Sequence, residues 1–248
     1  MIVTATHSEI TWEKLPDDFI LPDDPVDNIT QPLLAAALTD SLAVAGKLSD
    51  QTLTPTNYGI CATLSGKFVV KAPDWAFVPN IWVSREEVDR SYTPRLQGEI
   101  PVIVMEFLSE TDGGEYSVKP TYPPGKWFFY EQVLQVPYYI IFEPKSGSLE
   151  VYKLEDSGHY QLQEANEDGR SWISSIDLFL GVWQGTREHR TGYWLRWWDE
   201  AGELLLWGVE LVEVERQRAE AERQAKESAE QRAERLAAQL RDLGIEPE

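Results

Sequence analysis

The segment from Pro101 to Leu108, PVIVMEFL, is a nearly continuous apolar run that contains one acid, Glu106. Such a run is typical of a strand that is buried on both faces, because a strand with one face in water alternates apolar and polar residues. A sheet that is covered on both faces needs further layers of secondary structure above and below it. The segment therefore predicts a layered core, with one carboxylate inside its most hydrophobic strand.

Segments with helical and with strand-like patterns surround this strand. A helix is predicted from about Thr30 to Ala45, with Thr30 as its N-cap and Gly46 marking its end. A second helix is predicted over Lys126–Gln135, after a loop at 109–125 that is rich in Pro and Gly. Strands are expected at Tyr58–Leu64, Phe68–Val70, Trp75–Val78, Pro101–Leu108, Tyr138–Phe142, Leu149–Leu154, Trp194–Trp198 and Leu204–Trp207. This order predicts an α/β fold of the mixed α+β kind, in which helices flank a mixed β-sheet core.

The C-terminal segment has a different composition. Val209–Leu243 contains no Gly or Pro and consists largely of good helix formers, and Gly244 and Pro247 follow it. Apolar residues with 4-3-4-3 spacing indicate the seam of a possible coiled coil, although a single solvent-exposed helix accounts for the pattern as well. The seam consists of Ala229, Ala233, Leu236, Leu240 and Leu243.

These patterns divide the 248 residues into one domain at 1–208 and a charged C-terminal helix at 209–248. One ordinary domain with an appendage is what a chain of this length suits. Within the domain, the core is expected at about 30–154 and a strand-rich extension at 155–208.

Composition bears on the compartment and the partners. The N-terminus lacks the pattern of a signal peptide, no apolar stretch approaches ~18 residues, and the single cysteine, Cys61, cannot form an internal disulfide. We therefore expect a cytoplasmic protein without a membrane partner. The net charge of −20 disfavours tight non-specific binding to nucleic acid, which relies on Lys and Arg.

Three charged residues have positions that suit metal-dependent hydrolysis. Asp74 follows Pro73 at the junction of two predicted strands, Glu106 lies in the apolar strand, and Lys126 opens the second helix. A carboxylate inside an apolar strand is costly unless it is paired or binds a metal. Two carboxylates on adjacent strands can hold Mg²⁺, and a lysine beside the ion can orient water or stabilise developing charge.

The same residues also have a purely structural interpretation. Glu106 would pair with a base in the core, Asp74 would cap a turn, and Lys126 would lie at a solvated helix start. The spacing alone does not decide between the two interpretations. Lys119, inside the loop, competes with Lys126 as the candidate for the site lysine.

Four segments resemble the bacterial Uma family of restriction endonucleases, which belongs to the PD-(D/E)XK nuclease superfamily. They are Pro73-Asp74, Val102–Ser109 (VIVMEFLS), Lys126-x-x-x-Tyr130 and Val136–Pro144 (VPYYIIFEP). The resemblance covers roughly residues 58–154. It implies a restriction-endonuclease-like fold, DNA as the substrate and a homodimer. It also implies that Asp74, Glu106 and Lys126 are catalytic and that Asp74 and Glu106 bind Mg²⁺ or Mn²⁺.

The chain departs from the family pattern in two places. The E-x-K motif of the superfamily would place its lysine at Leu108, so the resemblance implies that this lysine has moved to Lys126. The usual D-P after the next strand is Glu143-Pro144 here. In addition, the long loop between Ser109 and Lys126 could displace the lysine from the metal.

The leading hypothesis is a metal-dependent endonuclease that hydrolyses phosphodiester bonds of DNA. The alternative is a catalytically silent endonuclease-like protein that acts as a regulatory or assembly module through its C-terminal helix. The first hypothesis requires a locally basic groove within a negative exterior. Candidate residues for the groove are Lys67, Lys71, Arg85, Arg90, Arg95, Lys119 and Lys126.

Overall fold

The apolar run around Glu106 forms strand β5 (Ile103–Phe107), and all five of its residues are buried. The computed structural model describes residues 10–14, 16, 29–108 and 114–242, and the chain divides into two compact units at 1–205 and 206–248. Strand β5 belongs to a five-stranded sheet of order β4-β5-β6-β7-β8 in the first unit. The other strands are β4 (Trp75–Phe77), β6 (Tyr138–Glu143), β7 (Ser148–Leu154) and β8 (Tyr160–Leu162).

This central sheet is mixed, as predicted. Strands β5 and β6 are parallel, whereas β4 with β5, β6 with β7 and β7 with β8 are antiparallel. A parallel pair needs a long crossover connection, because the chain must return to the end at which it started. The crossover from β5 to β6 contains the 109–125 loop and the second predicted helix. Lys126, at the start of the second predicted helix, therefore lies within this crossover.

Two smaller three-stranded sheets complete the strand structure of the described residues. One has the order β1-β2-β3, with β1 (Ile10–Thr11), β2 (Ile60–Leu64) and β3 (Lys67–Lys71). The other has the order β11-β10-β9, with β9 (Arg170–Ile173), β10 (Leu178–Arg187) and β11 (Arg190–Trp198). The prediction of a strand at Leu204–Trp207 is wrong, because this segment forms only an isolated β-bridge, between Leu204 and Trp198.

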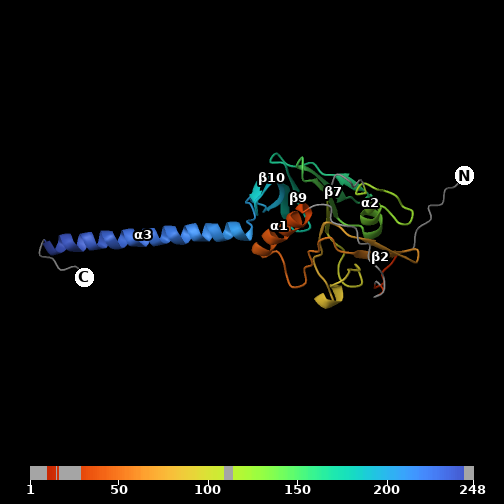
Figure 1. Cartoon of the computed structure of the whole chain (residues 1–248), viewed down its shortest axis with the longest axis horizontal. Helices are drawn as coiled ribbons and strands as arrows, with labels where there is room; N and C mark the ends of the chain where they lie inside the picture. The colour runs from red at the N-terminus through yellow and green to blue at the C-terminus, as the bar shows by residue number, and fades with distance from the viewer. Residues whose placement is uncertain (1–9, 15, 17–28, 109–113, 243–248) are drawn as a thin grey trace. The chain divides into compact units, whose positions relative to one another are not determined.

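Helix α1 (Thr30–Val44) packs against β11, in the part of the first unit where Figure 1 also labels β9 and β10. The helix also contacts the face of the central sheet that carries Trp75 of β4, because Trp75 Nε1 donates a hydrogen bond to Thr39 Oγ1 at 2.9 Å. The helix ends before Gly46, which has a φ of +67°, as the sequence predicts. The N-cap is Ile29 rather than Thr30, which is already helical.

The opposite face of the central sheet packs against the crossover. Helix α2 (Lys126–Phe128) continues as the π-helix η2 (Phe129–Leu134), where the sequence predicts one α-helix. The π-helix buries Phe129, Tyr130, Val133 and Leu134 in a cluster that also contains Ala76 of β4 and Val104 of β5. The buried side chains of η2 therefore fix the position at which α2 begins.

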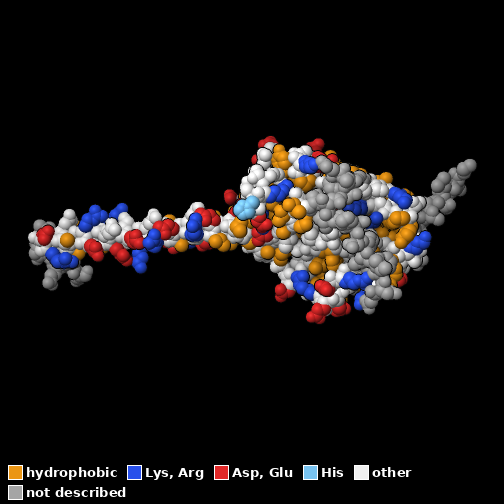
Figure 2. Space-filling model, in the orientation of Figure 1, with side chains coloured by type: hydrophobic (Ala, Val, Ile, Leu, Met, Phe, Trp, Pro, Cys, Tyr) orange, Lys and Arg blue, Asp and Glu red, His pale blue; other side chains and the backbone are white. Residues whose placement is uncertain are grey.

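The second unit contains α3 (Gly208–Asp242), a continuous helix of 35 residues. Its ion pairs follow i,i+3 and i,i+4 spacing, for example Arg223 with Glu220 and Glu227. Figure 2 shows Lys and Arg interspersed with Asp and Glu along it. The predicted stop at Gly244 and Pro247 lies outside the described residues. No helix among the described residues is both long and apolar enough to cross a membrane.

The position of α1 leads to a stability prediction. Leu38 is fully buried on α1, so we expect Leu38→Ala to lower the free energy of unfolding by about 2–5 kcal/mol through lost burial and a residual cavity. Urea unfolding followed by tryptophan fluorescence measures this change. The control is Leu162→Ala in β8, where the side chain is exposed and the expected change is below about 0.5 kcal/mol. Equal effects of the two substitutions would contradict the packing of α1.

Candidate active site

The pairing of β4 with β5 places Asp74 and Glu106 on one face of the sheet. Trp75 pairs with Met105, so the same antiparallel register sets Asp74, just before β4, opposite Glu106. Side chains alternate between faces along a strand, and Ala76 and Val104 both belong to the cluster on the η2 side. Asp74 and Glu106 therefore share the face on which η2 packs.

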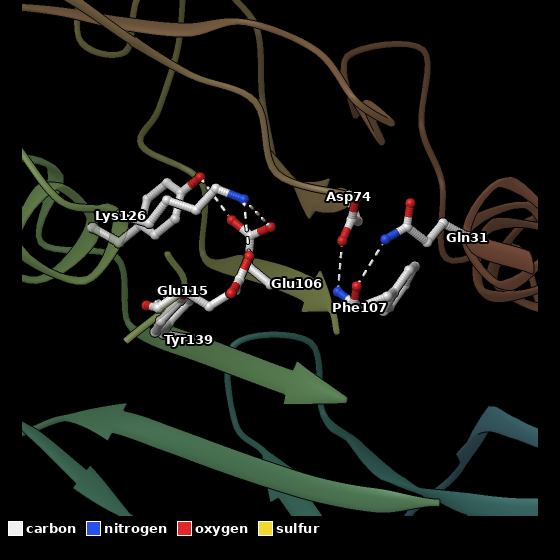
Figure 3. A network of polar contacts seen from close by, with 8 residues as sticks. Gln31, Asp74, Glu106, Phe107, Glu115, Lys126 and Tyr139 are labelled. Carbon is white, nitrogen blue, oxygen red and sulfur yellow. Dashed lines mark hydrogen bonds and ion pairs between the residues drawn. The ribbon is translucent and has the colours of Figure 1, made fainter. Parts of the chain in front are cut away.

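The backbone at Phe107 holds Asp74 in this position. The Phe107 amide donates a hydrogen bond to Asp74 Oδ2 at 2.5 Å. The carbonyl oxygen of the same residue accepts a hydrogen bond of 2.8 Å from Gln31 Nε2 on α1 (Figure 3). The aspartate is thus fixed by the end of β5, and α1 braces that end from the other side.

Glu106 is a carboxyl group in an almost dry environment, with 1% of its surface exposed. Tyr130 on η2 donates its hydroxyl hydrogen to Glu106 Oε1 at 3.2 Å, and Lys126 Nζ lies 3.0 Å from Oε2. The pKa of Glu106 is raised to about 8 as the net result of several effects. Desolvation is the largest cause and raises it, the charge of Lys126 and its hydrogen bond lower it, and the charges of Asp74 and Glu115 raise it. The positive charge of the neighbouring groups therefore does not fully compensate for the burial of Glu106.

Lys126 is the lysine that reaches Glu106. Its side chain is 27% exposed, and its ammonium group also lies 3.5 Å from Glu115 Oε1. Burial lowers the pKa of Lys126, but the charges of Glu106 and Glu115 outweigh burial and raise it, so the group stays protonated. The described contacts of Lys119 differ: its carbonyl accepts a hydrogen bond from Gly125, which precedes Lys126.

Glu115 is a part of this cluster that the sequence does not indicate. Glu115 is 4% exposed, and its backbone carbonyl accepts a hydrogen bond from the Tyr139 hydroxyl of β6 at 2.9 Å. Two more tyrosines attach the same loop to the sheets, Tyr116 to Glu150 and Tyr122 to the Phe68 carbonyl. Lys126 lies next to Glu106 despite the length of this loop, and the loop supplies a second carboxylate beside the lysine. In the sequence, only Tyr116 and Tyr122, which flank a polar stretch, indicate that this loop packs against the sheets.

Lysines gather beside the cluster. Burial lowers the pKa of Lys71, and the nearby charges of Lys126 and Lys119 lower it further while that of Glu106 raises it. Lys67, at the start of β3, lies over the ring of Tyr122 at 4.9 Å. The arginines proposed for a groove have other contacts: Arg85 binds carbonyls of Asp50 and Thr52, Arg90 binds the Pro16 carbonyl, and Arg95 lies over Trp12.

The donor set decides which ion the site could take. The described residues contain no group of three or more His, Cys, Asp and Glu side chains that could hold a metal. Two carboxylates still suit Mg²⁺, because this ion is commonly bound by one or two carboxylates together with waters and substrate phosphates. Burial raises the pKa of Glu106 more than Lys126 lowers it, and a further cation beside the carboxylate would offset this difference. Asp74 and Glu106 therefore fit such an ion.

Two other residues with reactive or titratable side chains, Cys61 and His159, have structural roles. Cys61 is fully buried in β2, and desolvation raises the pKa of its thiol to about 11, so it is a poor nucleophile. His159 binds Glu131 at 3.4 Å, and Glu131 also accepts a hydrogen bond from the Tyr160 amide, so this cluster fixes a turn.

The sequence of residues 21–186 matches the model of the Uma2 family, which is described as "putative restriction endonuclease". No curated protein matches the chain. The family match covers more than half of the 248 residues and includes the segments that provide Asp74, Glu106, Glu115 and Lys126. The protein therefore belongs to the Uma2 family of restriction-endonuclease-like proteins.

Proposed function

We propose that the protein is a metal-dependent endonuclease that hydrolyses phosphodiester bonds of DNA. The observation that carries this proposal is the contact of 3.0 Å between Lys126 and the buried Glu106, which lies opposite Asp74 on the neighbouring strand. Membership of the Uma2 family supports the same reaction class. Asp74 and Glu106 would hold Mg²⁺ or Mn²⁺.

Each residue has a separate task in this reaction. A bound divalent ion lowers the pKa of its water and neutralises charge on the phosphate. Asp74 and Glu106 orient the ion, and the hydrogen bonds from Phe107 and Tyr130 keep these two carboxylates in place. Lys126 is a fixed positive charge beside the reacting phosphate, where it stabilises the negative charge that develops in the transition state.

The four lysines beside the cluster provide the contact with DNA. Lys67, Lys71, Lys119 and Lys126 lie on β3, on the loop and at the start of α2. The proximity of Lys71 to Lys119 and Lys126 costs electrostatic energy, which a phosphate backbone would relieve. A local positive surface of this kind allows DNA binding despite the net charge of −20.

The test of the reaction is nicking of supercoiled plasmid in the presence of Mg²⁺ or Mn²⁺. We expect the wild-type protein to nick the plasmid and the double variant Asp74→Ala, Glu106→Ala to be inactive, because both metal ligands are lost. Lys126→Met should retain metal binding but lower the rate by roughly 10²–10³, the usual cost of removing one stabilising donor.

Lys119→Met is the matched control, because this lysine lies in the same loop region without a described contact to Glu106. Its nicking rate at saturating DNA should stay within about threefold of the wild type, since it would contribute one phosphate contact. If Lys119→Met abolishes nicking while Lys126→Met leaves it intact, the assignment of the site lysine is wrong.

Metal binding should depend on pH in a defined direction. A proton and a divalent ion compete for Glu106, whose pKa is about 8 in the metal-free protein. We therefore expect the affinity for Mg²⁺ to rise by roughly tenfold per pH unit below that pKa and to level off above it. Titration calorimetry between pH ~6 and ~9 measures the profile, and an affinity that does not change over this range would contradict the role of Glu106.

The proposed assembly is a homodimer formed mainly through the domain at 1–208. The predicted seam on α3 is rich in alanine, which buries little area, and Leu236 on it is 61% exposed in the single chain. Two domains in contact would raise the effective concentration of the two helices. This helix pairing is also what the alternative, a catalytically silent assembly module, would use.

Sedimentation equilibrium on the full chain and on a chain without residues 209–248 tests the assembly. We expect dimers in both cases, with weaker association of the truncated chain. A full-length chain that is monomeric at micromolar concentration refutes the dimer, whereas a truncated chain that is wholly monomeric assigns the contact to the helix.

A further inference from the structure

The ammonium group of Lys126 lies between two buried carboxylates, one from strand β5 and one from the loop that follows it. Its Nζ atom is 3.0 Å from Glu106 Oε2 and 3.5 Å from Glu115 Oε1. Figure 3 shows Glu106 and Glu115 approaching the lysine together. The shorter contact is with the strand residue, and the longer one is with the loop residue.

Glu115 has few other partners. The side-chain atom Glu115 Oε2 is buried, and no described residue donates a hydrogen bond to it. A buried carboxylate oxygen without a donor is costly, because it has lost water without gaining a replacement. Among the described side chains, Lys126 is the one whose ammonium group pairs with this carboxylate. The position of Glu115 thus depends on the lysine.

A divalent ion changes the balance between the two carboxylates. An ion bound to Glu106 places two positive charges beside the atoms that Lys126 now contacts, and like charges repel strongly at such distances when water is excluded. The lysine side chain is 27% exposed, so it has a path into solvent. Glu106 alone would then not hold the lysine in the site.

We infer that Glu115 is a positioning residue that keeps Lys126 in the site while Glu106 is engaged by a divalent ion. This inference rests on the proposed function for its catalytic consequence, but the shared lysine is a property of the metal-free protein. Glu115 does not bind the ion in this arrangement. It supplies the negative charge that Lys126 needs once Glu106 is shared.

The loop is anchored in a way that suits this role. The Tyr139 hydroxyl fixes the Glu115 backbone at 2.9 Å, and a Cβ added at Gly125 would come within 2.0 Å of the Ser117 carbonyl oxygen. The two ends of this stretch therefore lie against each other, and Gly125 leads directly into Lys126. Glu115 and Lys126 are held together by their own loop as well as by their charges.

A spectroscopic test does not need the metal. The ¹⁵N signal of the Lys126 ammonium group, identified by its loss in Lys126→Met, reports how tightly the group is held. In the metal-free protein at pH ~6, Glu106→Gln imitates a neutralised Glu106, and we expect the signal to persist. In Glu106→Gln, Glu115→Gln, hydrogen exchange of the group with water should be at least about tenfold faster, because a charged hydrogen bond is lost. The inference is wrong if Glu106→Gln alone releases the lysine or if the double variant still holds it.

A kinetic test separates positioning from metal binding. In Glu115→Gln we expect the maximal nicking rate to fall about tenfold, while the Mg²⁺ concentration for half-maximal rate stays within about threefold, because the lost group holds the lysine and not the ion. A higher half-maximal concentration with an unchanged maximal rate would make Glu115 a metal ligand and overturn the inference.

Tyr116→Phe is the matched control. It removes the hydrogen bond of 2.9 Å to Glu150 at the residue next to Glu115, without touching Lys126. We expect nicking close to that of the wild type, and a loss as large as that of Glu115→Gln would mean that loop placement alone explains the effect. If the wild-type protein does not nick DNA, the proposed function fails, and the ammonium signal still decides whether Glu115 holds the lysine.

Discussion

The burial of one carboxyl group in strand β5 determines how the rest of the site is built. Glu106 is 1% exposed, and removing a carboxylate from water costs several kcal/mol unless other groups replace the water. The replacement comes from the crossover between β5 and β6, which brings the Tyr130 hydroxyl and the Lys126 ammonium group to its two oxygens. The compensation is incomplete, since the pKa remains raised. The packing of η2 on the sheet determines where both groups approach Glu106.

The parts of the structure that follow from local chemistry could be predicted from the sequence. The apolar run identifies β5, the strand patterns at Tyr58–Leu64 and Phe68–Val70 identify β2 and β3, and the helix of the second unit follows from its composition. The placement of Asp74 opposite Glu106 also follows, once the Pro73-Asp74 junction is paired with β5. These predictions succeed because each depends on residues that are close in sequence or on one strand pairing.

The parts that depend on distant contacts could not be predicted. Strand β10 contains two glycines and polar residues, and its hairpin turns at Glu188 and His189, which adopt positive φ without the usual glycine. The position of Glu115 results from a hydrogen bond to Tyr139, 24 residues away, and from the packing of a loop whose polar sequence does not indicate any burial. Lys67 and Lys71 lie beside the site because β3 runs past the loop, which no pattern in either segment indicates. In each case a tertiary contact, and not a propensity, decides the conformation.

The π-helix η2 has a consequence for how this family member can change over time. A π-helix holds more residues per turn than an α-helix, so it contains a residue that an α-helix of the same span would not. Loss of one residue between Phe129 and Leu134 would let the segment relax to α-geometry, and each residue of an α-helix turns the chain by about 100°. The buried aromatic side chains would keep their places in the core, so the rotation would fall on the preceding turn and swing Lys126 away from Glu106. The number of residues in this segment, and not only their identity, is therefore what its lineage has to preserve.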